Sequence, residues 1–393
     1  MSLPILHALH TVDPKAAGLT EDVLLLAAVH RSLRHRIEIL TLDAPGTSWL
    51  RELGVPVHRV DSRRFFQWLG EHAAGYDCVL VSGISGCDAY RAWRVLKDAG
   101  TPYFVFAPRY FGFLSGLPRQ VEKWKQRWCW PWAGYPLLRE AHAVFFPNEE
   151  ARREARACFW PYDCHEFVLA CGAAEGEFLD GHPGLRGKRI FTVFAGESGT
   201  VPEALLGAVR ALADTGRWER DSMRLLISGG ADGAGAAAWR RAVDGRDLGG
   251  IVTLAAAPCG RARWGMLQAS EALVQPARAE NSGLMLAEAF AVGTPVLIAR
   301  GVNPWREAVG HGAGFAGDDT VEGYAELFTR WFEQSREGRD AMRANARQAF
   351  ETHYGEQAAA NTLMAVAYLL IGANQAGGNS TDPEIFRHET DFL

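Results

Sequence analysis

Short apolar runs that alternate with amphipathic helical patterns constrain the fold of this chain more than any other sequence feature. In the first half, apolar runs such as PILHALHT, RIEILTLD and DCVLVSG are separated by helical patterns such as FFQWLGEHA and AYRAWRVLKDAG. Buried strands that alternate with helices are typical of parallel sheets built from crossover units. The pattern therefore predicts an α/β fold with a doubly wound, Rossmann-like sheet.

The alternation lapses once and then starts again, which predicts two domains. The segment between the two series, GAAEGEFLDGHPGLRGK, is rich in glycine, proline and charge and indicates a linker. A second series then begins at RIFTVFAG, and a length of 393 residues agrees with two hydrophobic cores. The predicted parts are an N-terminal domain (1–172), a linker (173–188), a C-terminal domain (189–345), late helices (346–372) and a weakly ordered tail (373–393).

Charge and cysteine usage narrow the class of protein. A net charge of −5 argues against non-specific nucleic-acid binding, which needs a basic face. Seven cysteines, an odd number without a disulfide-like framework, favour a reducing, cytoplasmic compartment. Cys158, Cys164, His165 and Cys171 cluster but contain no CxxC pair, so we expect buried thiols and no metal site. We also expect no secretory signal and no transmembrane helix, because the longest apolar run, LMAVAYLLIG, is too short to span a bilayer.

Two glutamates flank the start of a predicted apolar helix in the second domain. The strand EALVQPA leads into the loop RAENS, which contains Glu280, and Glu288 follows eight residues later. The helix is expected to begin near Ser282 or Gly283, with Asn281 or Ser282 as its N-cap. A helix start offers free N–H groups to a phosphate or to sugar hydroxyls, and a glycine there allows close approach. Alternatively, Glu280 makes a capping contact and Glu288 is a surface residue.

The segment QPARAENSGLMLAEAFAVGTPVLIARGVNPWREAVGHGAGF resembles the donor-site signature of retaining GT-B glycosyltransferases of family 4, in the form found in bacterial polysaccharide and glycolipid assembly. The resemblance implies two Rossmann-like domains that face a cleft, with the donor bound by the C-terminal one. It also implies that Glu280 contacts the donor sugar, that Glu288 contacts the ribose, and that the Gly283–Leu284 step approaches the phosphates. The implied reaction moves a hexose, with retention, from a UDP- or GDP-linked sugar, and needs neither a metal nor a cofactor.

Other stretches extend the resemblance over most of the chain. The opening strand and loop match the family's glycine loop, in which Gly18 reaches toward the donor phosphates. PYFVFAPRYFGFL matches a stretch in which Arg109 lies near the donor sugar, a second catalytic candidate beside Glu280. Alternatively, Gly18 forms an ordinary turn and Arg109 lies in a surface loop. The late helices match the segment that crosses back onto the N-terminal, acceptor-side domain.

One part of the family pattern is missing. Family members carry an arginine and a lysine after the first strand of the donor domain, where they neutralise the departing diphosphate. Here that stretch reads AGESGTV, with Glu197 at the arginine position and no counterpart of the lysine. Losing one such donor typically costs about 3–4 kcal/mol of transition-state stabilisation. Three explanations are open. Other cations substitute for the pair, and the candidates are Arg278, Arg300 and Arg306. Alternatively, the charge of the donor lies elsewhere, or the chain is a weak or inactive homologue that binds glycans for a partner protein.

An aromatic and basic segment, residues 116–139, stands out in the first domain. Four of the 13 tryptophans fall within 124–132, among several lysines and arginines. Tryptophan beside basic residues suits a membrane interface, and Trp124, Lys125 and Trp128 are its candidate contacts for a membrane or a polyprenyl-linked acceptor. Peripheral contact at the inner membrane face would follow. Alternatively, the tryptophans pack inward. A further reading of the whole chain is another GT-B enzyme, such as a nucleotide-sugar epimerase.

Overall fold

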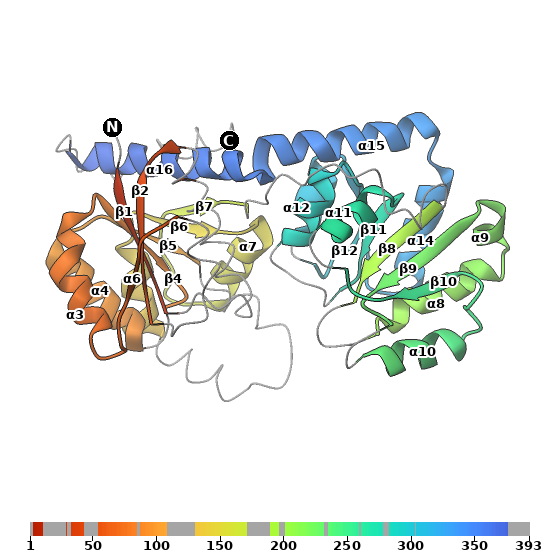
Figure 1. Ribbon diagram of the computed structural model, residues 1–393, viewed down its shortest axis with the longest axis horizontal. Helices are drawn as coiled ribbons and strands as arrows, with labels where there is room; N and C mark the ends of the chain where they lie inside the picture. The colour runs from red at the N-terminus through yellow and green to blue at the C-terminus, as the bar shows by residue number, and fades with distance from the viewer. Residues whose placement is uncertain are drawn as a thin grey trace.

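The computed structural model describes residues 3–10, 29, 33–42, 54–84, 87–107, 130–170, 189–195, 201–231, 235–258, 261–277, 283–302 and 304–375. Two parallel sheets, each covered by helices, lie side by side, and two long helices near the C-terminus run along the same side of both (Figure 1). The predicted α/β architecture with two Rossmann-like domains is confirmed.

The N-terminal sheet contains seven described strands in the order β3-β2-β1-β4-β5-β6-β7, all parallel. The order reverses between β1 and β4, which places a topological switch point at the carboxyl ends of these strands. β7 was not predicted from the sequence. The strands are β1 (Pro4–Leu9), β2 (Arg36–Thr41), β3 (Val57–Arg59), β4 (Cys78–Ser82), β5 (Tyr103–Phe106), β6 (Ala143–Phe146) and β7 (Glu166–Val168).

Both faces of this sheet are buried, as its continuous apolar runs require. Leu6 and Ala8 of β1 face a core formed with the helices of the domain. Ile5 and Leu9 face the opposite side, where the last long helix of the chain packs. The helices and short turns of the domain are α3 (Phe65–His72), η1 (Ala73–Gly75), α4 (Cys87–Ala99), η3 (Trp130–Gly134), α6 (Tyr135–Arg139) and α7 (Glu149–Cys158).

The C-terminal sheet has the order β10-β9-β8-β11-β12-β13 and is also parallel throughout. Its strands are β8 (Arg189–Phe194), β9 (Met223–Ser228), β10 (Val252–Ala255), β11 (Ala272–Gln275), β12 (Val296–Ala299) and β13 (Gly314–Gly317). Its helices are α8 (Glu203–Ala213), α9 (Arg217–Arg220), α10 (Ala236–Asp244), α11 (Arg261–Gln268), α12 (Leu284–Ala291), α13 (Trp305–Gly310) and α14 (Val321–Glu333).

The edge strand β13 was not predicted from the sequence, and its glycine explains part of the GHGAGF motif. A Cβ at Gly314 would lie 2.0 Å from the carbonyl oxygen of Val296 on the paired strand β12. Because a contact that short is impossible, only glycine permits β13 to pair at this point. The sequence therefore contains the glycine that this pairing requires, although the GAGF stretch does not have the apolar pattern of a strand.

The crossover to the N-terminal domain starts later than residue 346. Helix α15 (Arg336–Ala349) continues into a π-helical turn, η5 (Phe350–Tyr354), and then into α16 (Glu356–Gln375). Ala346, Ala349, Phe350 and Tyr354 belong to the core of the C-terminal domain. From Ala359 onward the buried residues of α16 pack in the N-terminal core, so the chain changes domain at the π-helical turn. The predicted linker and tail fall almost entirely outside the described residues.

Candidate functional site

Helix α12 begins at a glycine in a left-handed conformation. The N-cap is Gly283, with φ 87° and ψ 0°, a residue that has no side chain with which to cap the helix. The helix therefore starts after the predicted N-caps Asn281 and Ser282, because glycine is the residue that adopts this conformation at little cost. The first hydrogen bond within the helix runs from the Ala287 N–H to the Gly283 carbonyl at 2.9 Å, so the N–H groups of the first turn have no intrahelical acceptor.

Glu288 is the single charged residue of α12. The other side chains of the helix are apolar, and six of them are buried, from Met285 to Ala291. The side chain of Glu288 is 13% exposed, so it is not the surface residue of the alternative interpretation. A carboxylate at this depth needs a charged or hydrogen-bonding partner.

Arg263 provides that partner. Its Nη2 atom lies 2.8 Å from Oε2 of Glu288, and its side chain is 30% exposed. The same nitrogen contacts the sulfur of Met285, and the guanidinium carbon lies 5.2 Å from the ring centre of Phe194. Because Phe194 is the last residue of β8, this ion pair lies at the carboxyl end of that strand, beside the start of α12. Sequence reasoning missed Arg263, which belongs to the RARWGMLQ segment of α11.

Two predicted substitute cations already have carboxylate partners. Arg300 lies 2.7 Å from Asp318, and Arg306 lies 2.9 Å from Glu150. Both guanidinium groups also lie over the ring of Trp305, at 5.8 and 4.2 Å from its centre. Either arginine would have to leave a carboxylate in order to bind a diphosphate.

The NPWREAV motif joins the two domains. Glu307 of α13 accepts a hydrogen bond from the backbone N–H of Glu149, the first residue of α7, at 2.8 Å. Burial, and the nearby carboxylates of Glu149 and Glu150, raise the pKa of Glu307, against the lowering effect of that N–H bond. The Arg306–Glu150 pair lies next to this contact and also connects the domains. Motif residues that the resemblance associated with the donor site thus make an interdomain contact.

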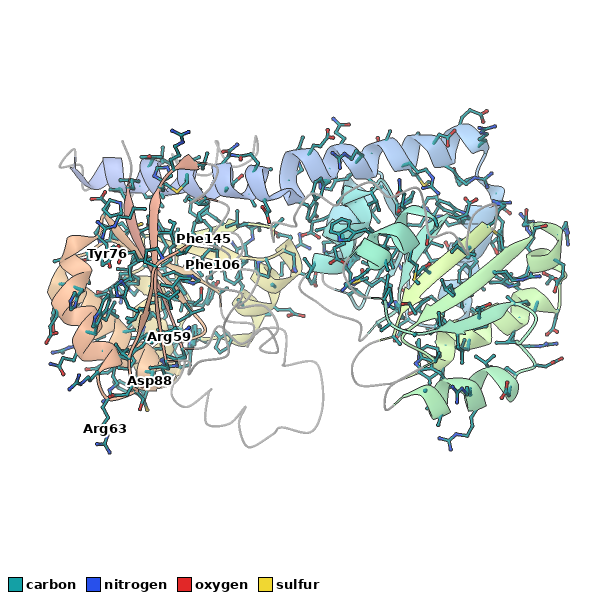
Figure 2. The ribbon with its side chains drawn as sticks, viewed as in Figure 1. Arg59, Arg63, Tyr76, Asp88, Phe106 and Phe145 are labelled. Carbon is teal, nitrogen blue, oxygen red and sulfur yellow. The ribbon has the colours of Figure 1, made fainter. Side chains whose placement is uncertain are left out.

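At the carboxyl edge of the N-terminal sheet, a histidine and an aspartate form a second polar group. Nε2 of His10, which follows β1, lies 4.0 Å from Oδ2 of Asp88 on α4. Burial lowers the pKa of His10, and Asp88 opposes this shift. Figure 2 shows Asp88 and Arg63 at one end of the domain, away from Phe106 and Phe145 of β5 and β6.

The described part of the aromatic and basic segment contains tryptophans in both environments. Trp130 is buried, packs against Phe159 at a centroid distance of 4.1 Å, and donates a hydrogen bond from its ring N–H to the Pro161 carbonyl. Trp132 is 78% exposed, and Trp160, which lies outside the segment, is 87% exposed. Of the two tryptophans of the segment that the structure describes, one therefore packs inward and the other does not.

Many predicted site residues lie outside the part of the chain that the structure describes: Gly18, Arg109, Trp124, Lys125, Trp128, Glu197, Arg278, Glu280, Asn281 and Ser282. Within the described ranges, no helix is both long and apolar enough to cross a bilayer. Within the same ranges, no group of three or more histidine, cysteine, aspartate or glutamate side chains is arranged to hold a metal ion.

Comparisons with known proteins agree with this architecture. Several solved structures share the fold over nearly the whole chain at low sequence identity. A glycosyltransferase from Rickettsia africae has a TM-score of 0.69 and 12% identity, covering 94% of this chain and 99% of its own. A sucrose-phosphate synthase from Thermosynechococcus elongatus has a TM-score of 0.66 and 16% identity, covering 94% of this chain and 100% of its own. Anabaena HepE in complex with UDP and glucose has a TM-score of 0.64 and 14% identity, covering 92% of this chain and 98% of its own.

Family models match both halves of the chain, whereas no curated protein matches it significantly. Residues 17–170 match the glycosyl transferase 4-like domain, and residues 183–349 match the glycosyl transferases group 1. The first match covers the N-terminal sheet from β2 onward, and the second covers the whole C-terminal sheet, including Arg263, Gly283 and Glu288. The chain therefore belongs to the group 1 glycosyltransferases and has their GT-B fold.

Proposed function

We propose that this glycosyltransferase moves a hexose from a nucleotide-sugar donor to a glycan or lipid-linked acceptor, with retention of configuration and without a metal ion. The observation that carries the proposal is the start of α12, where the left-handed Gly283 opens the helix N-terminus and the largely buried Glu288 is held by Arg263. A helix N-terminus attracts phosphate, and a fixed carboxylate accepts hydrogen bonds from paired hydroxyls. Both features suit a nucleoside diphosphate sugar.

The remaining donor-site roles follow the family signature. Glu280 and Arg109 would contact the sugar, and Gly18, Asn281, Ser282 and Leu284 would surround the phosphates. A UDP-linked hexose is the first donor to test, because the similar HepE structure contains UDP and glucose. GDP-linked sugars are the second.

The charge of the departing diphosphate must be met by groups other than the missing arginine and lysine. Arg278 lies in the segment that carries Glu280, whereas Arg300 and Arg306 are paired with Asp318 and Glu150. We therefore rank Arg278 first among the substitute cations. Replacing it with glutamine should lower kcat by about a hundred- to a thousand-fold, the usual cost of one lost charge-stabilising donor.

A lipid-linked acceptor is supported by the aromatic surface of the N-terminal domain. Trp132 and Trp160 expose most of their rings, and residues 116–139 place five lysines and arginines beside a single acid, Glu122. Tryptophan and basic side chains together favour the headgroup region of an anionic membrane. Peripheral contact there would bring the acceptor side of the protein to its substrate.

The experiment has two steps. Thermal shift with UDP- and GDP-linked hexoses asks whether the donor site binds, and release of free nucleotide with an acceptor panel asks whether transfer follows. We expect binding and release in the presence of EDTA, weaker binding and slower release in Glu288→Gln, and loss of release in Glu280→Gln. NMR of the product's anomeric carbon reports retention or inversion. Binding without release across the panel would instead favour a non-catalytic glycan-binding partner.

A further inference from the structure

We propose that Arg263 is a positioning residue of the donor site, which holds the Glu288 carboxylate in the orientation that accepts hydrogen bonds from the ribose of a nucleoside diphosphate. The inference rests on the proposed function, because it assumes that Glu288 faces the donor. Arg263 itself need not touch the ribose.

Contacts with two elements outside its own helix fix the position of Arg263. The residue belongs to α11, its guanidinium packs over Phe194 at the end of β8, and its Nη2 atom contacts both Met285 and Glu288 of α12. The planar guanidinium can stack on a ring and donate in its own plane at the same time. The arginine therefore joins the two segments that frame the predicted donor site, the end of β8 and the start of α12.

The position of Glu288 makes such a partner necessary. Apolar side chains surround it on α12, and its own side chain is 13% exposed. Without a cation, an ionised carboxylate at this depth would turn toward water or take up a proton. With Nη2 of Arg263 2.8 Å from Oε2, the charge of Glu288 is balanced before a negatively charged donor arrives. A carboxylate has about four acceptor positions, and an ion pair through Oε2 does not occupy all of them.

The balance of charge matters here because the sequence and the proposed donor bring further negative charge. The loop after β8 carries Glu197 where family members have an arginine, and the donor brings a diphosphate. A second unbalanced negative charge at Glu288 would repel that donor. Arg263 thus allows the site to keep a carboxylate for hydroxyl recognition without opposing the phosphates.

Discrimination between ribose and deoxyribose measures this role directly. Calorimetric titration compares UDP with 2′-deoxy-UDP, and GDP with 2′-deoxy-GDP, on the full chain. We expect the wild type to prefer the ribonucleotide of the pair it binds by about tenfold or more, the usual worth of a hydrogen bond to a charged group. Arg263→Gln and Glu288→Gln should each remove that preference. The double variant should be no worse than either single variant, because the two side chains act as one unit.

Arg217 offers a matched control. It also forms an ion pair, at 2.7 Å to Asp221, its side chain is 27% exposed, and its guanidinium lies 5.2 Å from the ring centre of Phe332. It precedes β9, at the opposite edge of the sheet from the carboxyl ends of the strands. Arg217→Gln should lower Tm about as much as Arg263→Gln and leave the ribose preference intact.

The outcomes separate the two proposals. If the wild type binds neither UDP nor GDP, the proposed function fails, and this inference fails with it. If Glu288→Gln loses the ribose preference while Arg263→Gln keeps it, the donor site stands and the role of Arg263 is refuted. If Arg263→Gln loses the same affinity for the ribonucleotide and for the deoxyribonucleotide, the positioning role is also refuted. Should Arg263→Gln fold poorly, Arg263→Lys must show an intermediate preference, because it keeps the charge and loses the planar geometry.

Discussion

Glu307 of the C-terminal domain caps a helix of the N-terminal domain: its carboxylate accepts the backbone N–H of Glu149, at the start of α7, at 2.8 Å. A negative charge at a helix N-terminus is favourable, since it meets a free N–H group and the positive end of the helix dipole. Burial and two neighbouring carboxylates oppose that charge. The contact joins residues 158 positions apart, and it links the two domains.

The raised pKa of Glu307 predicts a pH dependence of stability. A carboxyl group whose pKa is higher in the folded than in the unfolded state stabilises the fold at low pH, and this contribution is lost as the pH rises from the ordinary value of 4.5 through the raised one. Glu307→Gln keeps an acceptor oxygen without the charge. We expect the Tm of the variant minus that of the wild type to increase from pH 4.5 toward neutrality, in scanning calorimetry. A difference that is constant with pH would contradict the assignment.

The adjacent pair of Arg306 and Glu150 should stabilise the domain contact weakly. The two side chains are 38% and 27% exposed, and pairs of this kind contribute about 0.2–1 kcal/mol. A double-mutant cycle with Arg306→Gln and Glu150→Gln should give a coupling energy in this range, reduced at about 1 M salt by screening. If Arg306 also served the diphosphate, Arg306→Gln would weaken donor binding and Glu150→Gln would not.

The left-handed glycine at the start of α12 should tolerate no side chain without cost. Gly283 has φ 87°, so Gly283→Ala should destabilise the protein by about 1–2 kcal/mol. The added methyl group also stands at the helix N-terminus, so donor affinity should fall as well. Gly100→Ala is the control, because Gly100 has φ 65° with open space around it in the other domain. That control should lose stability and keep donor affinity; equal affinity losses would argue against a donor site at Gly283.

The exposed tryptophans should contribute to membrane binding. Vesicles of phosphatidylglycerol and phosphatidylethanolamine should bind the wild type in flotation, and high salt should weaken the binding. Replacing Trp132 and Trp160 by serine should reduce binding with little change in Tm, since both are largely exposed. Variants at Trp124 and Trp128 test the rest of the segment in the same assay.

Leu369→Ser provides the comparison, because Leu369 is an exposed apolar residue, 46% exposed, on α16 and outside the aromatic and basic segment. It should leave vesicle binding unchanged. Absence of binding by the wild type would remove the membrane contact from the proposed function.

The sequence was informative wherever structure follows from local pattern. Strands such as β1, β4 and β8 are buried on both faces, so their continuous apolar runs were visible directly. The strand–loop–helix–strand arrangement around α12 was visible for the same reason, as was the terminal helical region. Even Gly283 could be recognised as special, because a glycine at a predicted helix start is a local signal.

Tertiary structure decided what depends on a neighbour distant along the chain. The edge strands β7 and β13 escaped prediction because they are short and exist through pairing with β6 and β12; in β13 that pairing even demands a glycine. The chain passes from the C-terminal to the N-terminal domain at Phe350–Tyr354, and this position depends on which hydrophobic core the buried residues of α15 and α16 join. The partners of Glu288 and Glu307, which are Arg263 and the N–H of Glu149, follow from packing between separate elements. Local patterns determine which segments are buried, whereas the pairing of charges depends on where the fold brings those segments together.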